Sequence, residues 1–588
     1  MPKSPPEIYR QTARLLIVIG LLLFPVMAQA QSRSSGAAGS GTTSKPKLVV
    51  IIVVDQMRAD YVEKFGRQWT GGLRRLVDEG AWFREAAYPY AATETCVGHA
   101  TISTGSLPSS HGMVLNEWWN RQLLKEVTCT EDPNAKDVGY AGVTAKGGDS
   151  AANMLIPAFA DELKFQSGSG TRIVSFSLKA RAAITLGGRT ADAVTWFDSA
   201  AGGWVTSNAY PIVGFVEAFA KAHPVSADYG KKWSLLLPAS SYLYEQTAVG
   251  STPSPGFGAT FPHSLSGKEG SAAADSLFYS QWQVSPYADT YLAHMAENAV
   301  DKLELGKRGG TDFLAISFSS PDYVGHTFGP RSWEIQDILA RLDRDIGELF
   351  AHLDEKVGRG KYVVALTADH GVAPIPDDML KAGMAAGWAK AEDINSAITQ
   401  ASGANGYAKD ALAKVIGSDI YFGPGIYDKL KADPKTLTAI IEALEALPGI
   451  SRVYRAEELA DSRVSRSEIE TAEANSFLKA RNGDLLIVPK PFWSWDSSTA
   501  KRPRQYGATH GTPYYYDQRV PILLMGFGIK PGEYYGGVTP ADIAPTLAAL
   551  CGITLTTNEG HVLQQAIATS RLKVWTRGAG PAGRTAPN

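Results

Sequence analysis

The sequence has very little cysteine and no strong charge of either sign. Its three cysteines, Cys96, Cys129 and Cys551, exclude a disulfide scaffold, which needs many paired cysteines in a short chain. At most one bridge can form, and we predict it between Cys96 and Cys129. The formal net charge of -2 provides no general basic field, so we expect no nucleic-acid-binding surface.

Long apolar runs are also scarce, and the one that stands out lies near the N-terminus at 15–27. The basic residues Lys3, Arg10 and Arg14 precede it, and the small-residue motif at 28–30 follows it, as in a secretory signal peptide. The run is short for a membrane span, so a retained anchor is the less favoured alternative. We expect a periplasmic or secreted protein that has no membrane span after cleavage.

The remaining 558 or so residues have an ordinary globular composition, with 44% hydrophobic and 20% charged residues overall. The unbroken apolar run at 48–54 predicts a strand buried on both faces, as in a parallel sheet. Further strands are expected at 172–181, 313–318, 362–366 and 520–525, and helical patterns separate several of them. This alternation indicates an α/β fold.

Changes in composition suggest how the chain is organised. We expect a signal peptide at 1–30, a flexible linker at 31–46, core segments at 47–186, 306–373 and 506–563, an inserted lid or subdomain at 187–305, a second insertion at 374–505 and a C-terminal tail at 564–588.

Aspartate, histidine and threonine residues follow the predicted strands and Gly-flanked turns. They are Asp55, Thr95, Asp322, His326, Asp369, His370 and His510. Ligands gather at the carboxyl ends of strands in open α/β sheets, and carboxylate with imidazole but no thiolate suits a catalytic Zn²⁺ site. For any one of these residues alone, an ordinary core or turn position is the better interpretation.

Thr95 is expected at the N-terminus of a short helix that runs to Thr104 and stops at Gly105. A hydroxyl there faces unpaired N–H groups that favour an anion, although a plain N-cap threonine is the commoner role. Asp322 and His326 are expected in a strand-end loop where both could reach one ion. Lys179 and Arg181 are expected at a strand end, pointing the same way, unless they are only solvated cations.

The motifs VVDQMRADY, TETCVGHATISTG, LNEWW, SLKAR, SSPDYVGH, TADHG and ATHGTP together resemble the alkaline phosphatase superfamily. The resemblance is closest to the PafA-like branch of exported, zinc-dependent phosphomonoesterases that use a threonine nucleophile. It extends over about residues 47–555, and the order of the motifs is more specific than any one of them.

The resemblance implies a mixed, largely parallel central sheet flanked by helices, with two Zn²⁺ at its carboxyl edge. Asp322, His326 and His510 would hold one ion. Asp55, Asp369, His370 and the Thr95 oxygen would hold the other, and Asn116, Lys179 and Arg181 would contact phosphoryl oxygens. It further implies an alkaline phosphatase, a phosphoric monoester hydrolase acting on small-molecule phosphate monoesters through a phosphothreonine; we expect a monomer.

Three alternatives stay open at this point. A phosphodiesterase or nucleotide pyrophosphatase of the same superfamily would use the same metals and threonine. A sulfatase is less favoured, because Cys96 is followed by Val97 and Gly98 and lacks the Pro and Arg of that family's motif. A non-enzymatic exported metal-binding protein would leave Thr95 without a role.

Overall fold

The structure is a computed structural model that describes residues 45–168, 170–247, 250–252, 256–407, 411–461, 466–496 and 504–568. The predicted signal peptide, nearly all of the predicted linker and most of the predicted C-terminal tail lie outside the described residues. Within the described residues, no helix is both long and apolar enough to cross a membrane.

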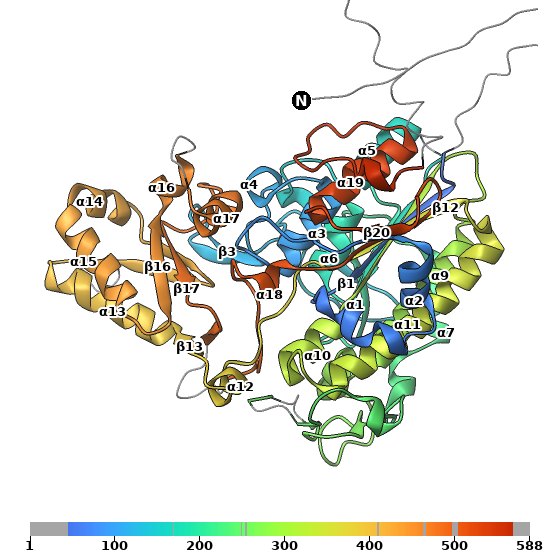
Figure 1. Cartoon of the computed structure of the whole chain (residues 1–588), viewed down its shortest axis with the longest axis horizontal. Helices are drawn as coiled ribbons and strands as arrows, with labels where there is room; N and C mark the ends of the chain where they lie inside the picture. Colours follow the sequence, from blue (N-terminus) through green and yellow to red (C-terminus); the bar gives the residue numbers. More distant parts are fainter. Residues whose placement is uncertain are drawn as a thin grey trace, which may run out of the picture. The chain divides into compact units, whose positions relative to one another are not determined.

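A ten-stranded mixed sheet forms the centre of the fold (Figure 1). In sheet order its strands are β20 (Gly532–Tyr534), β2 (Ala81–Phe83), β19 (Ile522–Gly526), β12 (Tyr362–Thr367), β1 (Leu48–Val54), β11 (Asp312–Phe318), β6 (Ile173–Ser177), β7 (Ala193–Asp198), β8 (Gly203–Ser207) and β5 (Asp137–Gly139). The five strands from β12 to β7 are mutually parallel, whereas β19 and β8 pair antiparallel with their neighbours. The predicted α/β fold with a mixed, largely parallel sheet is confirmed.

The central strand β1 shows why this sequence builds a buried sheet. All seven of its residues are apolar and fully buried, since parallel neighbours flank it on both sides and helices cover both faces. It pairs in register with β11 from Leu48↔Asp312 to Val54↔Phe318, and with β12 over nearly its whole length. The three strands therefore end side by side, and the residues that follow them emerge at one edge.

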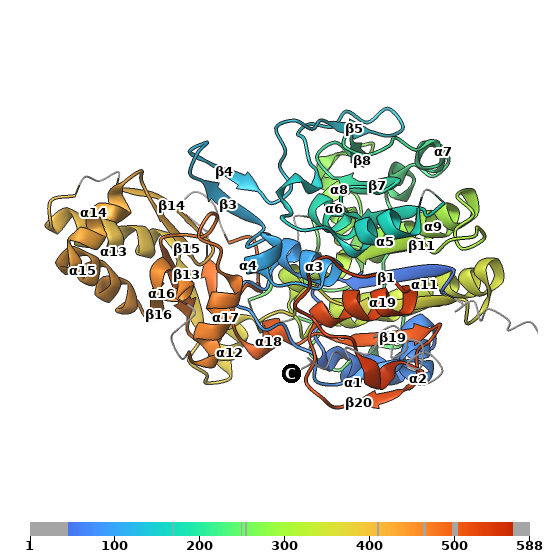
Figure 2. The ribbon, with the colours of Figure 1, turned by 90° about the horizontal axis from the view of Figure 1, so that it is seen from above.

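Helices cover the two faces of the sheet in two groups (Figures 1 and 2). One group contains α3 (Thr95–Thr104), α5 (Phe159–Ser167), α6 (Ala180–Gly187) and α19 (Ile543–Cys551). The other contains α2 (Gly72–Glu79), α9 (Pro286–Lys302), α10 (Ser320–Phe328) and α11 (Trp333–Leu353). Ser332 is the N-cap of α11, because its side chain accepts a hydrogen bond from the backbone N–H of Ile335.

The range 187–305, predicted as an inserted lid or subdomain, contributes directly to this core. It supplies β7 and β8 to the central sheet and α9 to the helix layer against α11. The buried rings of Phe197, Trp204 and Trp282 and the partly buried ring of Tyr291 form an aromatic cluster that joins these elements. The glycine and aromatic residues of this range thus belong to elements that pack in the core. The boundaries of a separate lid remain a prediction.

The described part of the range 374–505 contains a second sheet, which has four strands. Its order is β14 (Leu412–Ile416), β15 (Asp419–Phe422), β17 (Leu485–Pro489) and β16 (Ile450–Arg455). The helices α13 (Ala391–Ala404) and α15 (Pro434–Glu445) pack against each other and cover a hydrophobic cluster of its own. At the other end of the chain, the packed structure continues through Ala566, beyond the predicted start of the tail.

Candidate active site

The candidate site lies where four neighbouring strands of the central sheet end. Asp55 directly follows β1, Asp369 follows β12, Lys179 follows β6, and Asp322 lies in the helix after β11. All four side chains are at most 4% exposed. Sheet topology thus brings together charged residues that lie as far as 314 positions apart in the sequence, as predicted for the carboxyl edge of an α/β sheet.

Asp322, His326 and His510 form the first of two groups able to hold a metal ion. One ligand atom from each lies within 4.8 Å of the others. The prediction of a loop for Asp322 and His326 is wrong, because both lie in α10, which has Pro321 in its first turn. Their spacing of four residues places them one helical turn apart on the same face.

Backbone carbonyl groups orient the two imidazole rings in this group through their Nδ1 atoms. His326 Nδ1 lies 2.8 Å from the carbonyl oxygen of Ala508, and His510 Nδ1 lies 2.7 Å from that of Thr93. Each Nε2 therefore faces Asp322, at 3.2 and 3.7 Å from Oδ1. Backbone hydrogen bonds of this kind hold metal-binding histidines in the required tautomer.

Asp55, Asp322 and His370 form the second group, and all three are buried. Asp322 therefore belongs to both groups, whereas the family resemblance implied Asp369 together with Asp55 and His370. Asp369 lies close by, with its Oδ2 3.4 Å from His370 Nε2. The rings of His370 and His510 stack at 3.6 Å, so the two candidate metal sites are contiguous.

The residues present fit a pair of divalent cations. Buried ligand atoms lack hydrogen-bond partners among the described residues, namely Asp55 Oδ1, Asp369 Oδ2 and His370 Nε2. Burial lowers the pKa of His370 and of His510, which favours the neutral imidazole that binds metal. Oxygen and imidazole donors without thiolate are those of catalytic Zn²⁺ sites, so a binuclear metal site is supported.

Thr95 is the first residue of α3, and the predicted helix to Thr104 is confirmed. Gly105 ends it in the left-handed region, with φ of 70°. The Thr95 side chain is buried, and its Oγ1 lies 3.5 Å from Lys179 Nζ. A buried hydroxyl at a helix N-terminus beside an ammonium is well placed to hold an anionic group.

Lys179 lies deeper in the site than expected. Its ammonium contacts Asp55 at 2.7 Å and Asp322 at 2.6 Å, so it bridges the carboxylates of the second metal group. Burial disfavours the charged ammonium, but the two carboxylates outweigh this effect and raise the pKa of Lys179. The side chain is therefore a fixed positive charge next to Thr95.

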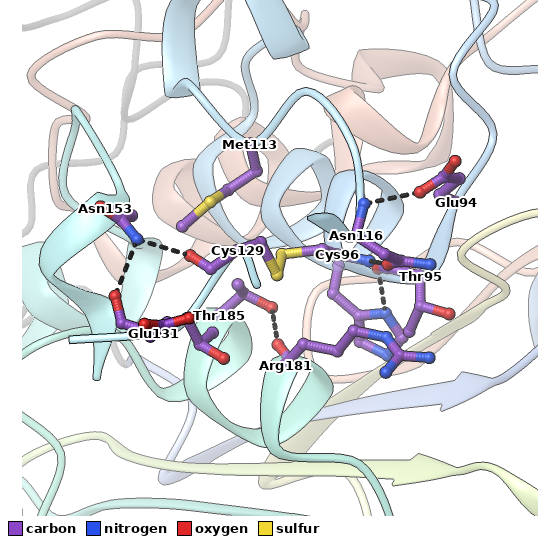
Figure 3. The surroundings of a disulfide bond; sticks show 12 residues. Glu94, Thr95, Cys96, Met113, Asn116, Cys129, Glu131, Asn153, Arg181 and Thr185 are labelled. Carbon is purple, nitrogen blue, oxygen red and sulfur yellow. Dashed lines mark hydrogen bonds between the residues drawn. A yellow bond between two sulfur atoms is a disulfide. The ribbon is translucent and has the colours of Figure 1, made fainter. Parts of the chain in front are cut away.

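Arg181 is on a helix and not on an extended strand. β6 ends at Ser177, Lys179 precedes α6, and Arg181 lies in the first turn of that helix. The prediction that both cations extend from one strand is therefore wrong, although both belong to the same edge. The Nε of Arg181 is buried without a hydrogen-bond partner among the described residues, and Figure 3 draws Arg181 among the surroundings of the disulfide together with Thr95 and Asn116.

Asn116 reaches the N-terminus of α3 from the loop before β3 (Glu117–Asn120). Its Oδ1 accepts a hydrogen bond from the backbone N–H of Cys96, at 2.9 Å. The side-chain N–H groups are thereby left to donate to a ligand. The predicted Cys96–Cys129 disulfide is present, and Cys551 is a buried free cysteine.

Two further residues support the site and were not singled out from the sequence. Gln56 has φ of 67°; its backbone N–H donates to Asp369 Oδ1 and its side chain to Asp322 Oδ1. His99 contacts the Thr95 carbonyl at 2.8 Å and lies 3.3 Å from Asp369. Its spacing of four from Thr95 could have revealed it. No local pattern marks Gln56.

Gly98 explains how α3 comes so close to the strand-end loop. A Cβ at this position would lie 2.0 Å from the carbonyl oxygen of Asp369. Only glycine allows this close approach of the two backbones, which brings Thr95 near the candidate metal ligands.

Comparison with known proteins agrees with this geometry. The matching family model is described as type I phosphodiesterase / nucleotide pyrophosphatase, and it covers residues 49–513. Alkaline phosphatase PhoV of Synechococcus elongatus is 32% identical over 558 residues, covering 92% of this chain and 96% of PhoV. Alkaline phosphatase PafA of Elizabethkingia meningoseptica is 32% identical over 533 residues, covering 88% and 94%.

The crystal structure of wild-type PafA matches with a TM-score of 0.80 and 30% identity, covering 89% of this chain and 99% of PafA. Fold, candidate metal groups and relatives together define an alkaline phosphatase-like hydrolase. Within that class, the chain belongs to the type I phosphodiesterase / nucleotide pyrophosphatase family and is of the PafA and PhoV kind. The non-enzymatic alternative has no support from these relatives.

Proposed function

We propose that this protein hydrolyses phosphate monoesters through a phosphothreonine at Thr95. The observation that carries the proposal is the position of Thr95 Oγ1: buried, at the N-terminus of α3, and 3.5 Å from the Lys179 ammonium. Two groups of candidate metal ligands lie at the same edge of the sheet. The curated relatives PhoV and PafA are named alkaline phosphatases.

Two Zn²⁺ are the proposed cofactors. Asp322, His326 and His510 would hold one, and Asp55, Asp369, His370 and the Thr95 oxygen the other; Asp322 belongs to both groups of candidate ligands. When bound, the ions would supply Lewis-acid stabilisation of negative charge on the entering and leaving oxygens. Mutually close carboxylates at one buried edge require such cations for charge balance, and Lys179 alone offsets only part of their charge.

The chain's own residues would perform the transfer as follows. Thr95 Oγ1 gives its proton to solvent water and attacks phosphorus, forming the Oγ–P bond while the bond to the leaving oxygen breaks. The leaving alcohol takes up one proton from solvent water, so this step consumes no net proton. Water then attacks phosphorus, the Oγ–P bond breaks, and the Thr95 hydroxyl regains its proton as phosphate leaves.

Asn116, Lys179 and Arg181 would bind the non-bridging phosphoryl oxygens. Lys179 is already fixed by two aspartates, and Asn116 by the backbone of Cys96. Donors that do not reorganise during the reaction stabilise the transition state most effectively. The Arg181 Nε, buried and without a partner among the described residues, is a further available donor.

We propose monoesters as the preferred substrates on grounds of charge. Two divalent cations would offset the three aspartates and a Thr95 alkoxide, which leaves the positive charges of Lys179 and Arg181. A monoester carries about -2 at alkaline pH and cancels them. A diester carries less charge, and its second ester group replaces an oxygen that the donors would bind.

We further propose that the protein is exported and acts as a monomer. The pattern at residues 1–30 is that of a signal peptide, and the Cys96–Cys129 disulfide suits an oxidising compartment. The substrate partners would be small-molecule phosphate monoesters, without nucleic acid.

The deciding experiment compares p-nitrophenyl phosphate with bis(p-nitrophenyl) phosphate on the purified, zinc-loaded protein. We expect a monoester kcat/KM at least about 10³ times that for the diester, since the loss of one donor interaction costs about 10²–10³-fold. The phosphodiesterase alternative, which the name of the matching family favours, predicts the reverse ratio. Equal rates would also contradict the proposal.

A further inference from the structure

The backbone and side chain of Asn116 are held from three directions. Its backbone N–H donates to Glu94 Oε2 at 2.6 Å, and its carbonyl oxygen accepts from the Cys129 N–H at 2.8 Å. Its Oδ1 accepts from the Cys96 N–H at 2.9 Å. Figure 3 shows Asn116 together with Glu94 and the Cys96–Cys129 disulfide. Three fixed contacts leave only the side-chain N–H groups free to face a ligand.

The two backbone donors that hold Asn116 belong to the two halves of the disulfide. Cys96 is the residue after Thr95 in α3, and Cys129 follows β4 (Lys125–Thr128), which pairs with β3. Both cysteines are fully buried. The disulfide therefore joins α3, which begins at Thr95, covalently to the β3–β4 hairpin, which directly follows Asn116.

Other contacts fix the hairpin side of this bridge. The side chain of Asn153 donates to the carbonyl oxygens of Cys129 and Glu131, at 3.1 and 3.2 Å. The peptide groups on both sides of Cys129 are thus engaged, one by Asn116 and one by Asn153. On the other side, Glu94 directly precedes Thr95 and Cys96 directly follows it, so two of the three residues that hold Asn116 flank the nucleophile.

We infer that Glu94 and the Cys96–Cys129 disulfide are positioning groups that hold the Asn116 amide donor at a fixed place relative to Thr95. The inference rests on the proposed function, in which Asn116 binds a phosphoryl oxygen. A displacement of about 1 Å in such a group can cost about 10²-fold in rate. The disulfide thus supports phosphoryl transfer in addition to any effect on unfolding.

A double-mutant cycle tests this inference with the zinc-loaded protein and p-nitrophenyl phosphate. Cys96→Ala with Cys129→Ala removes the bridge and leaves both backbone N–H donors in place. We expect kcat/KM to fall about tenfold or more in the wild-type background, but less than about twofold in an Asn116→Ala background. The control is Cys551→Ala, which removes a buried thiol that lies outside this bridge.

Equal losses in the two backgrounds would overturn the inference, because a purely structural disulfide acts regardless of Asn116. So would an unchanged kcat/KM in the bridge-free protein. Circular dichroism and thermal melting establish whether that variant is folded at the assay temperature.

Glu94 supplies a second test that keeps the disulfide intact and decides the matter if the bridge-free variant fails to fold. Glu94→Gln retains an oxygen that can accept from the Asn116 N–H, whereas Glu94→Ala does not. We expect Glu94→Ala to lose about tenfold in kcat/KM, Glu94→Gln to recover most of it, and neither change to matter in the Asn116→Ala background. Equal activity of the two variants, or an equal loss without Asn116, would overturn the inference.

Failure of the proposed function would look different. In that case Thr95→Ala would retain monoesterase activity, or the wild-type protein would have none. If monoesterase activity depends on Thr95 but shows no coupling between Asn116 and its anchors, the inference alone is refuted.

Discussion

The strand-end edge of the central sheet and the sheet of β14–β17 are built on opposite principles. The edge buries like charges together: Asp55 and Asp369 are fully buried, and desolvation together with Asp369 raises the pKa of Asp55. The second sheet buries hydrocarbon, with Ile420, Ile440 and Leu485 fully buried in its own cluster. Burial of like charges costs stability unless cations offset them, whereas the hydrocarbon packing of the second sheet stabilises the fold.

The two regions are nevertheless connected at the segment that leads to Thr95. The hydroxyl of Ser476 accepts hydrogen bonds from the backbone N–H groups of Ala91 and Ala92, at 2.9 and 3.0 Å. Arg481 donates to the carbonyl oxygens of Gly112 and Asn153. The range 374–505 therefore contacts segments of the candidate site through hydrogen bonds, and its contribution to activity can be tested separately.

Metal removal should have the largest effect and should act on the edge alone. Chelation is expected to reduce activity to background and Zn²⁺ to restore it, since the buried carboxylates lose the charges that balance them. Activity on p-nitrophenyl phosphate and the metal content of the same sample are the measurements. Full activity after verified metal removal would contradict the two-zinc proposal.

Substitution of the nucleophile comes next. Thr95→Ala should lower kcat by about 10⁴-fold, and Thr95→Ser, which retains a hydroxyl, should keep measurable activity. Acid quenching followed by intact-mass analysis should detect a phosphate adduct within residues 88–105 of the wild-type protein. An Ala variant that turns over at the wild-type rate would show that the nucleophile is misassigned.

The side chains of Lys179 and Arg181 should discriminate between monoester and diester substrates. Lys179→Ala combined with Arg181→Ala should lower monoester kcat/KM by about 10³-fold and diester kcat/KM much less, because the monoester carries the additional charge. Parallel assays on the two p-nitrophenyl esters measure the ratio. Equal losses on both would show that these residues do not recognise phosphoryl charge, which would favour the phosphodiesterase alternative.

The smallest effect on activity is expected from the second sheet. Ile440→Ala should reduce the unfolding free energy of this region by about 2–5 kcal/mol through a cavity, yet change kcat/KM by less than about twofold below its melting transition. Denaturant unfolding and steady-state assays provide the two readings. A loss of activity comparable to that of the cation variants would show that this region contributes to catalysis.

Local pattern in the sequence was enough to predict much of this protein. The run at 48–54 predicted β1 to the residue, and the stretch from Thr95 to Gly105 predicted both ends of α3. Burial on both faces and a glycine stop are properties of adjacent residues, so they leave a local pattern. The motif order likewise predicted the fold and the set of residues gathered at the edge.

Only the tertiary structure decided which of those residues touch. The shared position of Asp322 in two metal groups and its contact with Lys179 depend on the order of β1, β11 and β6 in the sheet. The membership of β7 and β8 in that sheet was likewise hidden by their composition. Contacts across hundreds of residues are set by strand pairing and by close backbone approach, as at Gly98, and neither leaves a periodic trace in the chain.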